Sequence, residues 1–269
     1  MNHNILYFND MRYLIIFFLF IFFSSSSQEK FYLEMKKKSI NTEDKIKIHC
    51  DKFDNFYYLS NQELIKNNNE RFNSVNNGEI TKIDFYNPME IKIWYEKFNV
   101  LILLDNKLNE IIKLDFNKLT ENIEVTNISN SNKNFIWIFD ENNDEILKYD
   151  FIKKRILNNV KIKVTAKLYD IISDYNSLWI LTSNELMKVN YNGLLDYRIP
   201  NSANFNKIRF FKKNIFLASD DSVGYLNKKE FKINLFKTPK LFIKDFFVIN
   251  ESLYIYEEDF YNRFLIKKN

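Results

Sequence analysis

The stretch Ser177-Leu178-Trp179-Ile180-Leu181-Thr182-Ser183-Asn184-Glu185-Leu186-Met187-Lys188 decides the fold. It contains two short apolar runs separated by turn-forming residues, a pattern typical of two β-strands joined by a tight turn. We expect Leu178–Leu181 to be the second strand of a four-stranded unit and Glu185–Tyr191 to be the third. Leu168–Ser173 would precede them as the inner strand, and the more polar Leu194–Ile199 would follow as the outer strand.

Similar runs recur along the chain at a period of about 40 residues. A signature of Glu, two apolar residues and Lys follows four of them, at Glu63–Lys66, Glu110–Lys113, Glu145–Lys148 and Glu185–Lys188. Such a period indicates either a β-propeller or a solenoid of helical pairs. Helical pairs need long stretches of 3.6-residue periodicity, whereas these runs are short and rich in Ile, Val, Phe, Tyr and Trp. The repeats therefore predict a propeller.

We expect an all-β, six-bladed β-propeller that occupies residues 28–269 as a single domain. The blades would span approximately 38–87, 88–124, 125–163, 164–201, 202–238 and 239–269. The last of these units lacks a fourth strand, and the segment 31–36 has no place in the first. We therefore expect the segment 31–36 to pair with the last blade as its outer strand, which would close the ring and remove an exposed edge.

The first 27 residues have the three parts of a secretory signal peptide. Arg12 precedes the unbroken apolar run Tyr13–Phe23, and the small polar residues Ser24–Ser27 follow. The run is too short for an ordinary bilayer-spanning helix, which needs about 20 residues. We expect export to the periplasm or cell envelope and no transmembrane span after cleavage, with an uncleaved anchor as the alternative. No Cys lies near the cleavage zone, so the protein is not expected to be a lipoprotein.

The run Ser177–Lys188 resembles the blades of six-bladed NHL-like and related exported bacterial propellers. Those blades carry an aromatic residue in the second strand, then a turn, then an apolar third strand with Lys. The resemblance extends from about Ile46 to the end of the chain, and the whole chain resembles uncharacterised exported propellers of the Bacteroidetes type. It implies a fold and an exported location but assigns no activity. The chain departs from these propellers by lacking the glycines of their turns.

Composition excludes several classes of protein. A hydrophobic content of 46%, with 17% aromatic residues, is too high for a disordered chain. One Cys excludes a disulfide framework and a Cys-cluster metal site, and three Gly leave no Gly-rich phosphate loop. Asn tolerates left-handed backbone and is expected to replace Gly in tight turns. A net charge of +4 together with an export signal argues against nucleic acid as a partner.

Candidate catalytic residues are few. Once the signal is removed, His49 is the only histidine. It adjoins Cys50 in an alternating strand pattern, and adjacent strand residues point to opposite faces, so they cannot form a dyad. The acidic stretch Asp140–Asp144 lacks the Gly and the final Glu of an EF-hand calcium loop and is interpreted as a solvated turn. We expect no catalytic residue, no metal site and no cofactor.

Aromatic residues supply the candidate binding site. Trp137 and Trp179 occupy equivalent second-strand positions and are expected in the core between blades. Trp94 lies at the end of the run Ile91–Tyr95, with Tyr95 and Phe98 close by in sequence. These three residues, Trp94, Tyr95 and Phe98, are the candidates for a binding surface on a loop face.

We therefore expect an exported, monomeric, non-enzymatic binding or scaffold protein of the cell envelope, whose partner is another envelope protein or an extracellular ligand. The alternative is a hydrolase or lyase of the lactonase or glycosidase type, with a carboxylate or metal site at the channel mouth. Carboxylates or His49 converging on the channel would favour the enzyme. An apolar or aromatic loop face would favour a partner surface.

Overall fold

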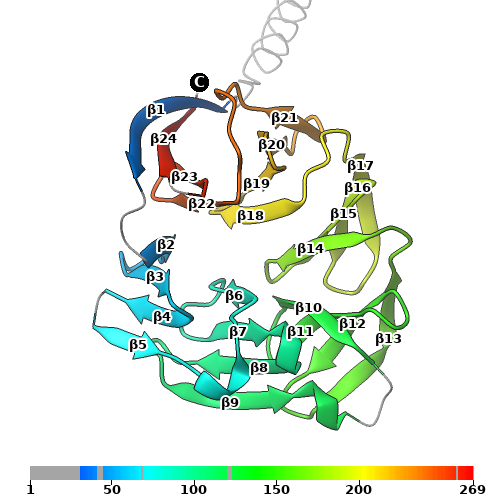
Figure 1. Cartoon of the computed structure of the whole chain (residues 1–269). Coiled ribbons are helices and arrows are strands. Elements are labelled where there is room, and N and C mark those ends of the chain that lie inside the picture. The colour runs from blue at the N-terminus through cyan, green and yellow to red at the C-terminus, as the bar shows by residue number, and fades with distance from the viewer. Residues whose placement is uncertain (1–30, 41–44, 68, 120–122, 259, 269) are drawn as a thin grey trace, which may run out of the picture.

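The computed structural model describes residues 31–40, 45–67, 69–119, 123–258 and 260–268, so the predicted signal peptide (1–27) lies outside the described residues. The described chain forms six four-stranded antiparallel sheets arranged as blades around a central channel (Figure 1). Three single-turn 3-10 helices lie in the loops, η1 (Val75–Asn77), η2 (Glu96–Phe98) and η3 (Phe116–Lys118). No helix within these residues is long and apolar enough to cross a membrane.

Each blade runs from an inner strand at the channel to an outer strand at the rim (Figure 1). The inner strands are β2 (Lys45–Cys50), β6 (Lys82–Asp84), β10 (Val125–Asn130), β14 (Leu168–Ser173), β18 (Lys207–Phe211) and β22 (Asp245–Ile249). The second strands are β3 (Phe56–Ser60), β7 (Ile91–Tyr95), β11 (Phe135–Asp140), β15 (Ser177–Thr182), β19 (Asn214–Ala218) and β23 (Ser252–Tyr256). The third strands are β4 (Glu63–Lys66), β8 (Val100–Leu104), β12 (Glu145–Asp150), β16 (Glu185–Asn190), β20 (Val223–Asn227) and β24 (Phe260–Lys268). The outer strands are β5 (Glu70–Phe72), β9 (Glu110–Asp115), β13 (Arg155–Lys163), β17 (Leu195–Pro200), β21 (Lys232–Leu235) and β1 (Phe31–Ile40).

The ring closes as predicted. β1 pairs antiparallel with β24, with Phe31 opposite Lys268 and Ile40 opposite Phe260, and so becomes the outer strand of the sixth blade. The ring of Phe31 packs edge-on against Tyr225 of the fifth blade at a centroid distance of 5.0 Å. The backbone N–H of Phe31 donates to the Tyr225 hydroxyl at 3.2 Å. The closing strand is therefore fixed both to its own blade and to the neighbouring one.

The hydrophobic core lies between neighbouring blades. The three tryptophans show the repeat most clearly, because Trp94, Trp137 and Trp179 all lie on second strands and are buried. Each packs in the apolar cluster between its own blade and the next one along the chain. The expectation for Trp137 and Trp179 is confirmed, and Trp94 holds the same place in the second blade.

The second blade differs from the reading of its sequence. Its sheet begins at Lys82 in β6, inside the range 38–87 expected for the first blade. The run Val100–Leu104 is consequently the third strand, and the Glu110 signature lies on the outer strand, one strand further out than its counterparts. The inner strand Lys82-Ile83-Asp84 has no apolar run; its charged residues contact other blades, Lys82 the fourth and Asp84 the third.

Tight turns rely largely on residues other than glycine. Of the non-glycine residues with positive φ, Asn is the commonest type, at Asn61, Asn67, Asn99, Asn204 and Asn250, as its tolerance of left-handed backbone predicts. Lys, Asp and even Leu108 and Phe231 also adopt this conformation. Gly224 in β20 is required by close packing and not by a turn, since a Cβ there would lie 2.9 Å from the carbonyl oxygen of Asn234.

Replacing Phe31 by Ala should destabilise the ring by about 1–3 kcal/mol, because it removes an aromatic ring packed between two blades. For a chain of this size the melting temperature should fall by about 2–4 °C for each kcal/mol. Tyr32→Ala is the matched control, since Tyr32 is exposed on the same strand. Thermal unfolding followed by circular dichroism checks both variants, and equal melting temperatures for them would show that Phe31 does not hold the closing strand.

Candidate functional site

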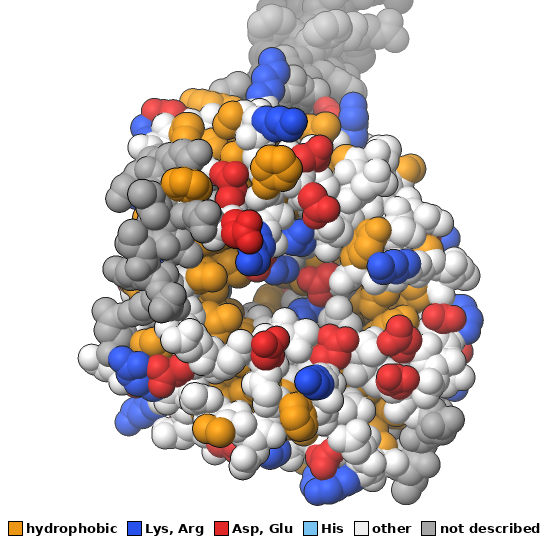
Figure 2. Space-filling view, in the orientation of Figure 1, with side chains coloured by type: hydrophobic (Ala, Val, Ile, Leu, Met, Phe, Trp, Pro, Cys, Tyr) orange, Lys and Arg blue, Asp and Glu red, His pale blue; other side chains and the backbone are white. Residues whose placement is uncertain are grey.

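Polar side chains from five consecutive blades meet in the central channel. Figure 2 shows an opening at the centre of the ring, with hydrophobic side chains on one side of it and charged side chains on the other. The charged side is built from inner-strand residues that hydrogen-bond or pair with one another. We call this set the charge ladder; it consists of Lys82, Asn127, Asp170, Arg209 and Asp245.

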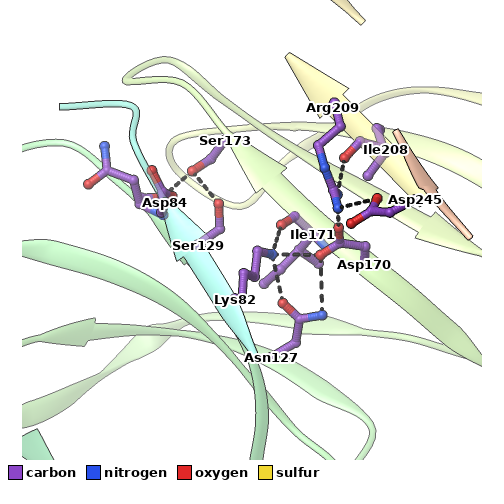
Figure 3. Close-up of polar contacts among 11 residues, drawn as sticks. Lys82, Asp84, Asn127, Ser129, Asp170, Ile171, Ser173, Ile208, Arg209 and Asp245 are labelled. Carbon is purple, nitrogen blue, oxygen red and sulfur yellow. Dashed lines mark hydrogen bonds and ion pairs between the residues drawn. The ribbon is translucent and has the colours of Figure 1, made fainter. Parts of the chain in front are cut away.

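Lys82 forms the tighter end of the charge ladder (Figure 3). Its Nζ lies 2.6 Å from Asp170 Oδ1 and donates to Asn127 Oδ1 at 2.9 Å and to the carbonyl oxygen of Ile171. The three acceptors match the three N–H donors of an ammonium group. The side chain thus reaches from the second blade to the fourth, and it is fully engaged by protein acceptors.

Arg209 forms the looser end of the charge ladder (Figure 3). Its Nη1 lies 3.3 Å from Asp170 Oδ2 and donates to the carbonyl oxygen of Ile208 at 2.8 Å, while Nη2 lies 3.3 Å from Asp245 Oδ1. Side-chain exposure is 32% for Arg209 and 38% for Asp245, compared with 17% for Lys82 and 13% for Asp170. Solvent therefore reaches the Arg209 end more readily than the Lys82 end.

β-bulges position two members of the charge ladder. The pairing of β10 with β11 shifts register between Val125 and Asn127, and that of β14 with β15 shifts between Leu168 and Asp170. Each shift leaves one residue unpaired just before Asn127 or Asp170. Bulges bend a strand and redirect the side chains beside them. In β10 and β14, a bulge thus lies directly before the polar side chain that faces the channel.

A second polar layer ties the third blade to its two neighbours. Ser129 Oγ and Ser173 Oγ lie 2.9 Å apart, and Ser173 also donates to the carbonyl oxygen of Asn130. The Asp84 carboxylate accepts from the backbone N–H of Asn130 at 2.9 Å (Figure 3). It also accepts from the backbone N–H of Tyr86 at 2.9 Å. Asp84 is therefore engaged in fixing the loop that follows β6.

Two tyrosines from different blades meet in the loops that follow these inner strands. The rings of Tyr86 and Tyr175 are edge-to-face with centroids 4.8 Å apart, and the Tyr175 N–H donates to the Tyr86 hydroxyl at 3.3 Å. Both side chains remain exposed, although partial burial raises the pKa of Tyr86. We call this pair the tyrosine bridge. It joins the loops after β6 and β14, which lie in the second and fourth blades.

His49 has a packing role beside the channel. Its ring stacks on Phe85 with centroids 4.4 Å apart and an interplanar angle of 6°, so it joins the first blade to the second. Burial lowers the pKa of His49 to about 4, against the pull of the Asp51 and Asp84 carboxylates. The imidazole is therefore neutral at pH 7 and a weak general base. Within the residues that the structure describes, no group of three or more His, Cys, Asp or Glu side chains could hold a metal ion.

The three aromatic residues predicted from the sequence are not brought together on one surface. Trp94 and Tyr95 are buried, with exposed fractions of 0% and 1%, and burial raises the pKa of Tyr95 to about 12. The Trp94 indole N–H and the Tyr95 hydroxyl have no hydrogen-bond partner in the described part of the chain. Phe98 is exposed, on the loop between β7 and β8. Of the three, only Phe98 is accessible to a partner.

The sequence reading missed the charge ladder and the tyrosine bridge. One signal was present in the sequence. Asp170 lies inside the predicted inner strand Leu168–Ser173, and Arg209 lies inside an apolar stretch. A charged side chain in such a segment is costly unless it is paired. The tyrosines gave no such signal, since Tyr86 and Tyr175 lie in ordinary polar loops. Their meeting depends on the placement of blades that are far apart in sequence.

Comparisons with known proteins support the fold. No protein-family model matches the chain, and no curated protein matches it in sequence. Among solved structures it is similar to a streptogramin B lyase, with a TM-score of 0.59 and 13% identity over 91% of this chain and 100% of that one. It is also similar to virginiamycin B lyase from Staphylococcus aureus, with a TM-score of 0.57 and 11% identity over 88% of this chain and 99% of that one. The extracellular domain of a putative hybrid two component system from B. thetaiotaomicron has a TM-score of 0.57 and 11% identity over 80% of this chain, but this covers only 33% of that chain. At these identities the likeness concerns the propeller fold alone.

Asp170→Asn should destabilise the protein by about 1–3 kcal/mol, because Lys82 and Arg209 would lose the anion that lies between them in a partly buried site. Glu251→Gln is the control, since it breaks the exposed ion pair with Lys212 and should change stability by no more than about 0.5 kcal/mol. Urea unfolding measures both. Equal stability of the two variants would mean that the charge ladder adds nothing beyond a surface pair.

The pKa of His49 predicts a dependence of stability on pH. The pKa of His49 is about 4 in the folded chain and 6.5 ordinarily. Between pH 4 and pH 6.5 the unfolded chain therefore binds a proton at His49 that the folded chain does not bind. Stability should be complete above pH 6.5 and should fall as the pH drops toward 4, by at most about 3 kcal/mol from this residue. His49→Phe keeps a ring beside Phe85 and should lose this part of the pH dependence. Parallel pH profiles of wild type and variant, measured by urea unfolding, would contradict the assignment.

Proposed function

We propose that this chain is an exported, non-enzymatic binding protein of the cell envelope. Its partner, another envelope protein or an extracellular ligand, binds at the channel mouth that carries the tyrosine bridge. The observation that carries the proposal is the tyrosine bridge itself, an exposed aromatic pair that joins loops of the second and fourth blades. Function in propellers resides in such loops rather than in the fold.

The chemistry of the mouth suits a protein or amphipathic partner. Met89 is exposed on the same loop as Tyr86, and Phe53 is exposed on the corresponding loop of the first blade. Aromatic residues and Met are enriched in the cores of binding interfaces, because they supply much contact area at little entropic cost. Tyr also offers a hydroxyl to the partner. These residues would form the contact surface.

The ionisable groups of the channel favour binding over catalysis. Lys82 is saturated with acceptors, Asp84 holds backbone N–H groups, and His49 is stacked and neutral. A general base or nucleophile needs a free group with a pKa near the working pH. The charges of the ladder instead compensate one another, since it holds two cations and two carboxylates. Such a site is pre-organised for recognition.

Export rests on the sequence of the first 27 residues, with Arg12, the apolar run Tyr13–Phe23 and the serines that follow. The similarity to an extracellular propeller domain from B. thetaiotaomicron is consistent with that location.

A lyase or hydrolase of the propeller type is the second candidate. The likeness to streptogramin B lyase extends over the full length of that enzyme, and two carboxylates, Asp170 and Asp245, face the channel. Asp84 is a third carboxylate nearby. The three do not form an unpaired acidic cluster, because a cation engages Asp170 and Asp245 and backbone N–H groups engage Asp84. This candidate predicts turnover of a substrate, whereas the binding protein predicts a stable complex.

The purified protein used as bait should recover a partner from a cross-linked envelope extract, and the native protein should fractionate with the envelope. Tyr86→Ser combined with Tyr175→Ser should reduce partner recovery at least tenfold. Phe242→Ser is the matched control, because Phe242 is an exposed aromatic residue on the loop between β21 and β22. A Phe98→Ser variant tests the accessible residue among Trp94, Tyr95 and Phe98, the three predicted from the sequence. Recovery that survives the tyrosine changes and is lost with Phe98→Ser or Phe242→Ser would place the binding surface elsewhere.

A further inference from the structure

We infer that the Arg209 end of the charge ladder is a binding site for a zwitterion, namely an α-amino acid with an apolar side chain. The inference goes beyond the proposed binding function, because it assigns a second site. It concerns the interior of the channel, on the far side of Asp170 from Lys82, rather than the tyrosine bridge. The argument begins with the hydrogen-bonding capacity that Arg209 and Asp245 leave unused.

Both residues keep free polar atoms within the described part of the chain. A guanidinium group has five N–H donors, and those of Arg209 that are engaged lie on Nη1 and Nη2, bound to Ile208, Asp170 and Asp245. Nε has no acceptor among the described residues. Asp245 uses Oδ1 for Arg209 and for the N–H of Phe246, at 2.7 Å, and leaves Oδ2 without a donor there. One unused donor group and one unused acceptor therefore lie on neighbouring residues of opposite charge.

The ion pairs at this end are also weaker than those at the other end. Charge-assisted N–H···O bonds are usually 2.7–2.9 Å long, and Lys82 lies 2.6 Å from Asp170, whereas both pairs of Arg209 are 3.3 Å long. Both side chains are about one third exposed. A ligand can thus reach Arg209 and Asp245 without first breaking a short, buried ion pair.

The arrangement of charge selects a ligand that carries both signs. A lone carboxylate that approaches Arg209 also meets Asp170 and Asp245, and a lone ammonium that approaches Asp245 also meets Arg209. The carboxylate would gain one attraction and meet two repulsions, and the ammonium would gain one attraction and meet one repulsion. The carboxylate and ammonium of an α-amino acid are separated by a single carbon atom, so they can face Arg209 and Asp245 at the same time. Electrostatic complementarity of this kind confers specificity.

Apolar surface beside the charged pair would receive the side chain of the ligand. The guanidinium carbon of Arg209 lies 5.7 Å from the centre of the Phe247 ring. Phe247 is partly exposed and packs against the same apolar cluster as Ile46 and Phe85. Figure 2 shows hydrophobic side chains on the side of the opening that faces the charged residues. An apolar amino acid would therefore be bound at its polar end by charge and at its other end by burial.

Isothermal titration with L-leucine and L-phenylalanine tests the inference on the wild-type protein. Two blocked analogues separate the charges, because N-acetyl-L-leucine lacks the ammonium and L-leucinamide lacks the carboxylate. Each analogue should bind at least tenfold more weakly than L-leucine. A peptide N-terminus resembles the amide and should bind as weakly. Absence of binding by both amino acids at millimolar concentration, or equal binding of L-leucine and its analogues, would overturn the inference.

Variants locate the site. Arg209→Gln and Asp245→Asn should each weaken L-leucine binding at least tenfold, while Glu251→Gln, which alters an exposed ion pair, should leave it unchanged. Melting temperatures show whether each variant is folded, and the analogue series on the wild type does not depend on them. Unchanged affinity in folded Arg209→Gln would also overturn the inference. If the amino acids fail to bind but the tyrosine changes still abolish partner recovery, the zwitterion site is wrong and the proposed function stands.

Discussion

The packing of apolar blade faces against one another is the interaction on which the rest of the structure depends. Every residue of β8 and β15 is buried, although these strands belong to different blades and different positions within them. A sheet buried on both faces has no polar face to offer to solvent. Few charged side chains therefore lie on the second strands, and Lys92 of β7, which is buried, pairs with Glu90. The channel is where charged side chains from four blades, those of Lys82, Asp170, Arg209 and Asp245, meet.

That constraint also explains which parts of the fold could be predicted from sequence. Blades with a clear apolar run in the inner and second strands were predictable almost to the residue, as the fourth blade shows with β14 to β17. The closing strand was predictable too. The last blade lacked a fourth strand in the sequence, and the segment 31–36 belonged to no other blade, so the two could be matched. The second blade was misread since its inner strand, Lys82–Asp84, carries two charges and lacks the apolar run that marks the others.

The candidate site was beyond the sequence for a different reason. The charge ladder joins Lys82, Asp170 and Arg209, which are separated by whole blades, and two of its members follow bulges that no residue pattern signals. Trp94 and Tyr95 were chosen because they are aromatic and close to a turn, yet they are buried like the other second-strand aromatics. Accessibility was decided by the packing of neighbouring blades. Tyr86 and Tyr175, which lie in loops outside the strands, remain exposed.

The pairing of β1 with β24 makes the sixth blade the one that joins the two ends of the sequence. Five blades are built from strands that follow one another along the chain, so each can assemble from local hairpins as it is synthesised. The sixth needs its outer strand from Phe31–Ile40 and its third strand from Phe260–Lys268, at opposite ends of the sequence. Without β1 the outer edge of β24 would be unpaired, and unpaired edges recruit other chains. The sixth blade is therefore the one whose completion depends on contacts between the two ends of the sequence, and loss of β1 would leave it prone to aggregation.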